Sequence, residues 1–562
     1  MANAQSPLIV TRAAQMFPRL SGDEIARVSR FGEARHYRAG DMVARVGAVG
    51  AGLMLIVSGE VEVTQHTETG NRAVIVTHQR GSFLGELAQL SGRPFLVDAT
   101  ALTAVEAVAI PPERLRALLV AEAELGETIM RALILRRVGL IEAGAGPVVI
   151  GPEGDADVLR LVNFLRRNGF PHQHLDSRSD GCAQTLVERF HVSSNELPIV
   201  LCPGGELLRN PTEQQLGRCL GMTGAMDGER LFDVIIVGAG PSGLATAVYA
   251  ASEGLSVLAL DCRSFGGQAG ASARIENYLG FPTGISGMAL MGRAFSQAQK
   301  FGVEIGIPQE AVALECGDDG FAVRLATGER VQARTVVIAS GARYRRLGVA
   351  GLEAFEGKSV HYWASPLEAD LAAGQDVALV GGGNSAGQAT VFLAGRTRRV
   401  TVVARRPLTA TMSSYLVERI EGLPNVDVVI GAEVTALAGD GGELETVVLR
   451  DRASGLETRQ PARQLFSFIG AEPNTDWLSG CAIELDPSRF VLTGSAAGTG
   501  RLPLETSRRG VFAIGDVRSG SVKRVAAAVG DGAQVVAAIH ACLGADAERP
   551  ASPQRIATAA VP

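Results

Sequence analysis

The chain has 562 residues, of which 46% are apolar and 20% are charged, and its net charge is −6. This length predicts about three or four soluble globular domains. The acidic balance disfavours nucleic acid as a partner, because phosphate binding requires a basic surface. The N-terminus lacks the basic start and apolar run of a secretory signal. Polar residues interrupt the most apolar late stretch, 525–545, so we expect no membrane span.

Seven cysteines are scattered along the chain, and none of them forms a Cys-x-x-Cys pair. This pattern disfavours a disulfide scaffold and a zinc ribbon, and we expect no metal site. A cytoplasmic, reducing location follows as a prediction. Cys202 is expected to pack as a small hydrophobic side chain.

The front of the chain, from about residue 20 to 110, alternates short apolar runs with glycine-containing turns. Examples are Leu53–Val57, Val61–Val63 and Ala73–Val76. Strands of this length and spacing predict a small antiparallel β barrel or jelly roll. Apolar residues at helical spacing follow Pro111, so we expect a helix with one buried face.

A small linker, 144–147, separates this barrel from a middle segment. The expected strands there are Val148–Ile150, His172–Asp176, Ile199–Leu201 and Leu207–Leu208, and the clearest helices are Asp157–Asn168 and Glu213–Leu220. The order strand–helix–strand–helix–strand–strand–helix is typical of a thioredoxin-like unit.

The first glycine-rich turn follows an apolar strand and consists of Gly238, Ala239, Gly240, Pro241, Ser242 and Gly243. The first glycine permits a tight turn, the second lets the backbone approach a pyrophosphate, and the third lets the helix pack close to the sheet. Asp261 closes the next strand, where its carboxylate is placed to accept hydrogen bonds from ribose hydroxyls. The turn predicts a dinucleotide site at a helix N-terminus, where free N–H groups favour negative charge.

The second glycine-rich turn also follows an apolar strand and consists of Gly381, Gly382, Gly383, Asn384, Ser385 and Ala386. The next strand, 400–403, leads to Arg405 and Arg406 and has no carboxylate at its end. Arginines at this place suit a 2′-phosphate, so NADPH is favoured over NADH. Two such turns predict parallel sheets with helices on both faces. They also predict a flavin that relays electrons from a nicotinamide.

From residue 232 onward the chain resembles the low-molecular-weight thioredoxin reductases, a family within the pyridine nucleotide-disulfide oxidoreductases. The motifs that carry the resemblance are 266–268, 275–282, 338–342, 468–470 with 473–475, and 510–516. The resemblance implies FAD and NADPH as cofactors, with an NADPH module that is inserted in the FAD module and can rotate. It assigns Gly267, Gly341 and Gly515 to FAD binding. It also implies that Gln268 and Asn277 lie near the isoalloxazine and that Asp516 bonds the ribityl chain.

One departure from this family concerns its redox cysteines. The family carries Cys-Ala-Thr-Cys before the NADPH strand, whereas this chain has Trp363, Ala364, Ser365 and Pro366. Neither Trp363 nor Pro366 can form a thiolate pair, so the usual transfer from flavin to disulfide is unavailable there. Electrons could instead pass from FAD to an external acceptor such as a small molecule, dioxygen or ferredoxin. They could also pass to a partner's disulfide docked at the flavin. A ligand-gated sensor with little turnover and a reductase with relocated cysteines remain alternatives.

Residues 10–143 resemble a cyclic nucleotide-binding domain, through 56–63 and the run from Gly81 to Ala88. In that family an arginine about nine residues after the glutamate pairs with the phosphate, and here Phe95 occupies its place while Arg93 is displaced. A structural or regulatory docking role is therefore favoured over cyclic nucleotide binding. The helical stretch 122–141 resembles the dimerising helix of such proteins, so a homodimer is expected.

The middle segment resembles glutaredoxin or thioredoxin, but 151–156 contains no cysteine where the redox pair belongs. Leu197–Pro198 matches the cis-proline position of that fold. We expect a redox-silent docking or spacer unit. The sequence thus predicts a multidomain chain with a barrel (1–143), a thioredoxin-like α/β domain (147–223) and two nested Rossmann-like α/β domains. These are an FAD domain (230–346 and 464–546) and an inserted NADPH domain (347–463).

Overall fold

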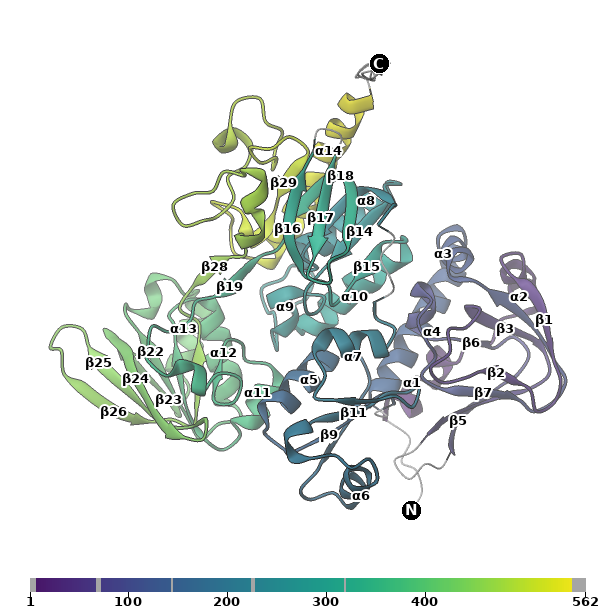
Figure 1. Ribbon diagram of the computed structural model, residues 1–562, viewed down its shortest axis with the longest axis horizontal. Helices are drawn as coiled ribbons and strands as arrows, with labels where there is room; N and C mark the ends of the chain where they lie inside the picture. The colour runs from purple at the N-terminus through teal and green to yellow at the C-terminus, as the bar shows by residue number, and fades with distance from the viewer. Residues whose placement is uncertain (1–6, 67–71, 143–144, 224–227, 318–319, 548–562) are drawn as a thin grey trace, which may run out of the picture.

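The computed structural model describes residues 7–66, 72–142, 145–223, 228–317 and 320–547, and they form four packed bodies (Figure 1). The N-terminal barrel lies beside a small mixed-sheet unit, which packs beneath the body that contains α8 (Pro241–Ser252) and also contacts the body that contains α11 (Pro366–Leu371) and α12 (Asn384–Ala394). Gly144, in the predicted linker, is outside the described residues. The small unit therefore touches all three of the other bodies.

The N-terminal body contains two four-stranded sheets with the orders β1-β8-β3-β6 and β2-β7-β4-β5. Its elements are α1 (Pro7–Met16), α2 (Gly22–Ser29), β1 (Glu33–Tyr37), β2 (Met42–Ala44), β3 (Leu53–Ser58), β4 (Val61–His66), β5 (Arg72–His78), β6 (Phe83–Leu84), β7 (Asp98–Ala101), β8 (Val105–Ile110), α3 (Pro112–Ala121) and α4 (Ala123–Glu142). Every sheet pairing is antiparallel. The predicted barrel is confirmed.

Helix α4 packs against the barrel of its own chain. Ile129, Ala132 and Leu133 are fully buried in one apolar cluster with the barrel residues Leu53 and Leu55. The periodic apolar residues that predicted this helix thus bury their face within the chain, and the expected homodimer stays a prediction.

The middle body contains β9 (Val148–Gly151), α5 (Ala156–Arg167), β10 (Gln173–Asp176), α6 (Gly181–Arg189), β11 (Ile199–Leu201), β12 (Leu207–Arg209) and α7 (Glu213–Cys219). The sheet order is β10-β9-β11-β12, with β9 and β10 parallel and the other pairs antiparallel. The peptide bond Leu197–Pro198 is cis. The predicted element order and the predicted cis-proline are both confirmed.

The third body is a seven-stranded sheet of β15 (Glu304–Gly306), β14 (Val257–Leu260), β13 (Leu231–Val237), β18 (Arg330–Ile338), β17 (Phe321–Leu325), β16 (Ala311–Cys316) and β29 (Val511–Ala513). Strand β13 is parallel to both neighbours. Ile235 and Val237 face one apolar cluster, and Val234 and Ile236 face another. The alternation buries both faces of the sheet, which explains the unbroken apolar run of this strand. Its helices are α8 (Pro241–Ser252), α9 (Gly267–Ala271), α10 (Gly287–Lys300) and α14 (Val525–Ala547).

The fourth body is inserted in the third and has a parallel sheet of β20 (Val360–His361), β27 (Gln464–Ser467), β21 (Asp376–Val380), β22 (Arg399–Ala404) and β23 (Val426–Ile430). The antiparallel strands β24 (Ala432–Asp440), β25 (Glu443–Asp451) and β26 (Glu457–Pro461) form a second sheet, and the helices are α11 (Pro366–Leu371), α12 (Asn384–Ala394) and α13 (Ser414–Glu421). Strands β19 (Ala342–Tyr344) and β28 (Ala471–Pro473) pair where the chain enters and leaves this body.

The predicted boundary at residue 464 is wrong by a few residues. Strand β27 pairs with β20 and β21, so it belongs to the inserted body. The reason is burial, since Leu465 and Phe466 are fully buried among residues of that body. The chain returns to the third body at β28.

Helix α14 is long and apolar enough to cross a membrane by length and composition alone, although we expected its polar residues to exclude this. In the structure Val535, Val536 and Ile539 are buried in the apolar cluster shared with β13 and α8. The helix also lies so close to α8 that a Cβ on Gly532 would be 2.6 Å from the Ser242 carbonyl oxygen. Core helices of this kind pass the same composition test as membrane spans.

Two disulfides contradict the expectation drawn from the scattered cysteines. They join Cys202 to Cys219 and Cys316 to Cys481, with Cα–Cα separations of 6.4 and 5.6 Å. Cys202 is therefore bonded and does not merely pack as a hydrophobic side chain. Sequence separations of 17 and 165 residues gave no local signal, because the tertiary fold brings each pair together.

Candidate functional site

The first glycine-rich turn links β13 to α8 and needs its glycines for packing. Gly238 has φ +115°, and a Cβ there would lie 2.1 Å from the Ala339 carbonyl oxygen. A Cβ on Gly243 would lie 1.8 Å from the Gly238 carbonyl oxygen. Gly240 differs, since among the described residues only the Gly267 Cα would lie within 4.0 Å of a Cβ added there. The backbone is therefore open at Gly240, directly before the helix, where a phosphate can approach.

Asp261 lies after β14 and holds this turn in place. One carboxylate oxygen accepts the backbone N–H of Ala239 at 3.0 Å, and the other accepts those of Arg263 and Ser264 at 3.0 and 3.1 Å. Such backbone bonds fix the orientation of the carboxylate. The side chain remains part of the wall of a cavity.

This cavity of about 780 Å³ lies between the third and fourth bodies. Its volume is within the usual range for cofactor sites. The predicted residues that line it are Gly238, Gly240, Pro241, Ser242, Asp261, Gly267, Gln268, Asn277, Gly341, Asp516, Asn384, Ser385 and Trp363. The predicted residues outside its wall are Gly243, Gly515, Gly381, Gly383, Ala386, Arg405, Arg406 and Pro366. Both glycine-rich turns thus contribute to one cavity, through different residues.

At the far side of the cavity Asp516 lies beside Lys523. Burial raises the pKa of the Asp516 carboxyl, and Lys523 partly opposes this shift. The Lys523 ammonium donates to the Asp516 carbonyl oxygen at 2.5 Å. Gly515 donates its N–H to Asp531 at 3.0 Å, which fixes the turn that carries Asp516. A buried carboxyl of this kind is costly without a ligand and suits hydrogen bonding to hydroxyls.

The second glycine-rich turn links β21 to α12 and is more open. A Cβ on Gly383 would meet no atom of the described residues within 4 Å. The Asn384 side chain accepts the backbone N–H of Ser413 at 2.7 Å, which ties the start of α12 to α13. Arg405 and Arg406 follow β22 and are exposed. They lie outside the cavity wall.

Residues 363–366, which the sequence predicts to stand in place of the family's dithiol, lead into α11. Ser365 and Glu368 make a capping box, and the Trp363 indole N–H donates to Glu368 Oε1 at 2.9 Å. Asn163 of α5 donates to the same oxygen at 3.2 Å. Trp363 lines the cavity. Its indole N–H bonds Glu368 of α11, and its ring lies against the guanidinium of Arg167 from α5.

One free thiol, Cys262, also lines the cavity. Desolvation at the cavity wall and the neighbouring Asp261 charge raise the pKa of this thiol to about 12, although the residue is exposed. A thiol is a nucleophile only as thiolate, so the raised pKa makes Cys262 a poor nucleophile at neutral pH.

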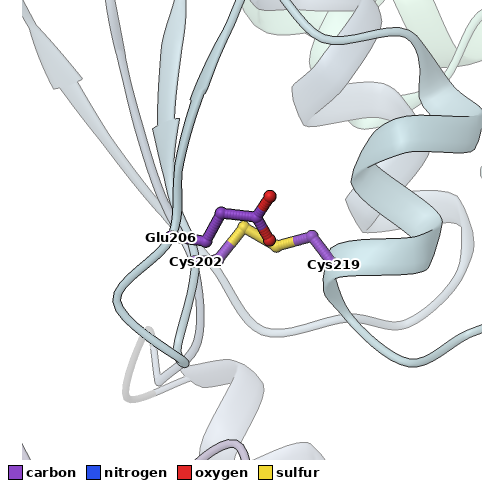
Figure 2. Close-up of side chains that lie close together, drawn as sticks. All are labelled: Cys202, Glu206 and Cys219. Carbon is purple, nitrogen blue, oxygen red and sulfur yellow. A yellow bond between two sulfur atoms is a disulfide. The ribbon is translucent and has the colours of Figure 1, made fainter.

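The Cys202–Cys219 disulfide lies in the middle body, between the end of β11 and the end of α7, with the Glu206 carboxylate beside it (Figure 2). The two cysteine sulfurs and a Glu206 carboxylate oxygen all lie within 4.8 Å of one another, a spacing compatible with a metal ion. Because metal binding by cysteine requires free thiolates, the disulfide form cannot supply these two sulfurs as thiolates.

In the barrel, Glu86 accepts a hydrogen bond from Arg137 at 3.4 Å, and its Oε2 is buried without a hydrogen-bond partner among the described residues. Burial lowers the pKa of Arg93 to about 10, with Arg137 adding to the shift and Glu86 opposing it. Phe95 is buried where the family's arginine would stand. The glutamate of the predicted phosphate turn is thus paired through one oxygen within the protein, and its other oxygen has no partner among the described residues.

Sequence reasoning missed several cavity residues, among them Tyr344, Lys523 and Arg167. Tyr344 and Lys523 lie close in sequence to motifs that were recognised. Arg167 comes from the thioredoxin-like unit, and no pattern in the sequence could have placed it at a cavity formed by two other bodies.

Comparison with known families assigns two parts of the chain. Residues 232–532 match the model described as pyridine nucleotide-disulphide oxidoreductase, and residues 34–122 match the cyclic nucleotide-binding domain. The predicted resemblances of the front and of the long C-terminal region are confirmed. The thioredoxin-like unit has the predicted topology, but its role stays a prediction.

Curated relatives match the C-terminal region. The chain is 33% identical over 329 residues to the F component of the alkyl hydroperoxide reductase from Pseudomonas putida, covering 57% of this chain and 61% of that protein. It is 34% identical over 303 residues to thioredoxin reductase of Treponema pallidum, covering 54% of this chain and 94% of that protein. The chain thus spans about three fifths of the length of the first relative and nearly all of the second.

Solved structures agree with this assignment. Thioredoxin reductase of T. acidophilum is 31% identical with a TM-score of 0.52, covering 56% of this chain and 99% of that one. The same score is found for the Lactococcus lactis enzyme at 26% identity. The family binds FAD and depends on NADPH, and the open backbone at Gly240 and the cavity it borders fit a dinucleotide. The chain belongs to the pyridine nucleotide-disulphide oxidoreductases and has a thioredoxin-reductase-like fold preceded by a cyclic nucleotide-binding domain.

Proposed function

We propose that this chain oxidises NADPH and passes the electron pair to an acceptor outside the family's usual dithiol site. The third and fourth bodies would act as nested nucleotide-binding units, one for FAD and one for NADPH. The observation that carries this proposal is the shared cavity, which the start of α12 borders opposite the first glycine-rich turn. Residues from both units therefore meet at one place.

The roles of the residues follow from their positions. Gly240 and the first amides of α8 would receive the FAD pyrophosphate, and Asp261 would orient the adjacent ribose. Asp516 would hold the hydroxylated chain of the cofactor. Arg405 and Arg406 would bind the 2′-phosphate of NADPH, because a guanidinium makes charge-assisted, bidentate bonds to phosphate. When bound, FAD supplies an acceptor for hydride and a store for two electrons.

The acceptor is proposed to react at the cavity directly. In the balanced reaction, NADPH, a proton and the oxidised acceptor give NADP⁺ and the two-electron-reduced acceptor. Trp363 stands where the family has a thiol, and Cys262 is held as a neutral thiol. A small two-electron acceptor or a partner's disulfide fits this equation. With ferredoxin, NADPH would reduce two ferredoxins by one electron each and give NADP⁺ and a released proton.

Anaerobic stopped-flow mixing of the FAD-loaded protein with NADPH tests the proposal. The expected result is bleaching of the flavin band, followed by reoxidation on addition of one of four acceptors: a thioredoxin, a ferredoxin, a quinone or dioxygen. Protein that binds FAD but is not bleached by NADPH would overturn it. NADH serves as the matched donor control, since it lacks the 2′-phosphate.

A second candidate acceptor is the internal disulfide Cys202–Cys219. The structure brings these cysteines together in the thioredoxin-like unit, and Cys219 is only partly buried. NADPH and a proton would reduce this bond to two thiols and leave NADP⁺. Anaerobic titration counts the electrons, since the wild type would take up two more per chain than a Cys202→Ser, Cys219→Ser variant. Cys182→Ser, which changes an exposed free thiol, is the control. Equal uptake by all three proteins would exclude this acceptor.

The cytoplasmic location and the homodimer remain proposals. The two disulfides remove the cysteine pattern as an argument for a reducing compartment. We propose that the barrel serves as a docking or regulatory unit, which the internal pairing of Glu86 with Arg137 supports.

A further inference from the structure

The last residue of α5, Arg167, belongs to the thioredoxin-like unit and lines the cavity between the third and fourth bodies. We propose that Arg167 binds the pyrophosphate of FAD, so that the thioredoxin-like unit completes the flavin site. This inference rests on the proposed function, because it assumes that the cavity holds FAD. It gives the unit without a redox pair a role in cofactor binding.

The Arg167 guanidinium lies beside the first glycine-rich turn. One terminal nitrogen donates to the Gly267 carbonyl oxygen at 2.9 Å. Gly267 touches the first glycine-rich turn, since a Cβ on it would lie 3.2 Å from the Gly240 Cα. Gly266 donates its N–H to the Ala239 carbonyl oxygen at 2.7 Å. Arg167 is therefore placed beside the open backbone where a pyrophosphate would meet the start of α8.

The Nε of Arg167 is a buried hydrogen-bond donor that has no partner among the described residues. A buried donor without an acceptor costs free energy, so such groups are found paired in native proteins. The Trp363 ring, with its centroid 5.8 Å from the guanidinium carbon, covers part of the cation but offers no strong acceptor. Phosphate oxygens would satisfy the Nε–H and a terminal N–H together.

The charge of the Arg167 side chain also favours a phosphate ligand. Burial lowers the pKa of Arg167, while the Asp261, Glu368 and Glu213 carboxylates oppose the shift and Arg263 adds to it. Arginine remains charged at neutral pH despite such a shift. The guanidinium therefore keeps its charge at the wall of the cavity, where the phosphate groups of a bound nucleotide could pair with it.

The end of α5 that carries Arg167 is held rigidly against the third body. The Asn168 side chain donates to the Arg263 carbonyl oxygen at 3.0 Å and to the Phe164 carbonyl oxygen at 2.9 Å. Gly217 of α7 lies against Pro308, which would be 2.7 Å from a Cβ on that glycine. These contacts fix the end of α5 on the third body, and a group held in advance loses less entropy on binding.

The test measures FAD affinity of the full-length chain, stripped of flavin, by quenching of flavin fluorescence. Arg167→Ala is expected to raise the Kd about 10- to 100-fold, the range for a lost hydrogen bond to a charged group. Arg167→Lys keeps the charge without the planar fork and should lose less. The matched control is Arg166→Ala, which removes the exposed arginine next to it on the same helix.

Salt dependence separates binding from structural support. Loss of a phosphate contact should flatten the dependence of log Kd on log salt for Arg167→Ala, whereas Arg166→Ala should keep the wild-type slope. A wild-type Kd in Arg167→Ala, or a raised Kd with an unchanged slope and a lowered Tm, would overturn the inference. Wild-type chain that binds no FAD would instead overturn the proposed function, and this inference with it.

Discussion

The two glycine-rich turns share a backbone plan but differ in what surrounds them. At the first turn, a Cβ on Gly243 would lie 1.8 Å from the Gly238 carbonyl oxygen, and Arg167 of the thioredoxin-like unit donates to Gly267 beside Gly240. At the second turn, a Cβ on Gly381 would lie 2.7 Å from the Phe468 carbonyl oxygen, but Ala386 takes the third position and no atom of the described residues lies within 4 Å of a Cβ on Gly383. An enclosed turn suits a cofactor that stays bound, and an open turn suits a substrate that must leave after each cycle.

The residues at the end of the strand that follows each turn also differ. After the first turn the next strand leads to Asp261, which is bonded to backbone N–H groups, and after the second it leads to exposed arginines. In the proposed function, the local strand–turn–helix geometry would create a phosphate site in both cases. The residues beyond each turn would then select the nucleotide and set how readily it exchanges.

The largest expected effect comes from adding one methyl group to the enclosed turn. In Gly243→Ala the new Cβ would lie 1.8 Å from the Gly238 carbonyl oxygen, which belongs to backbone that cannot move away. We expect a loss of about 3 kcal/mol or more in unfolding free energy and purification without FAD. Urea unfolding and the flavin absorbance per chain measure these effects.

The control for this change is the reverse substitution in the open turn. Ala386→Gly removes a buried methyl group in the first turn of α12, so we expect a loss of about 1 kcal/mol from helix propensity and normal FAD content. Equal effects of the two substitutions would contradict the contrast between the turns.

An intermediate effect is expected at the open strand end. Replacing Arg405 and Arg406 by Ala should raise KM for NADPH about tenfold, since a charge-assisted phosphate contact is lost. KM for NADH should not change. Steady-state kinetics with both donors measure the ratio, and Arg399→Ala at the other end of β22 is the matched control. A parallel rise for NADH would show that these arginines do not select the 2′-phosphate.

The smallest expected effect concerns Asp516, whose burial is expected to lower the stability of the protein without its cofactor. Burial raises the pKa of Asp516, so the folded apo protein disfavours its ionised form. Its stabilising contribution is present at acidic pH and is lost as pH rises through the raised pKa. Asp516→Asn should therefore raise the Tm of the apo protein at neutral pH, with the gain vanishing in acid, and should weaken FAD binding.

Asp486 provides a control of opposite sign. Burial opposes ionisation there, but bonds from Ser519, Phe490 and Ser488 keep the pKa of its carboxyl lowered. Asp486→Asn should lower Tm at neutral pH, and this loss should shrink as pH falls through the lowered pKa. Thermal unfolding of both apo variants across pH measures the contrast, and shifts of the same sign would refute it.

Local patterns predicted most of the elements. The alternation at Val61–Val63 and the apolar run before Gly238 each specified a strand, because burial on one face or two leaves a distinct pattern. Glycines at Gly238 and Gly243 were recognisable because neither position has room for a Cβ. The end of the inserted unit was misplaced, since β27 is equally apolar whichever sheet receives it.

Features that depend on distant packing left no pattern to find. Cys316 and Cys481 meet only after β16 packs against the short 3-10 helix 476–481. Arg167 looks like any other basic residue at a helix C-terminus, where such residues are common. Its contact with Gly267 depends on how one unit docks on another, and this is specified by tertiary packing.

The Cys316–Cys481 bond has a topological consequence. Its two ends flank the entire inserted unit, so both connections to that unit lie within one closed covalent ring. Any single cleavage between residues 317 and 480 would open the ring and leave the two fragments joined by sulfur. Protease-nicked chain should therefore migrate as one species on a non-reducing gel, and it should separate into two only after a reductant is added.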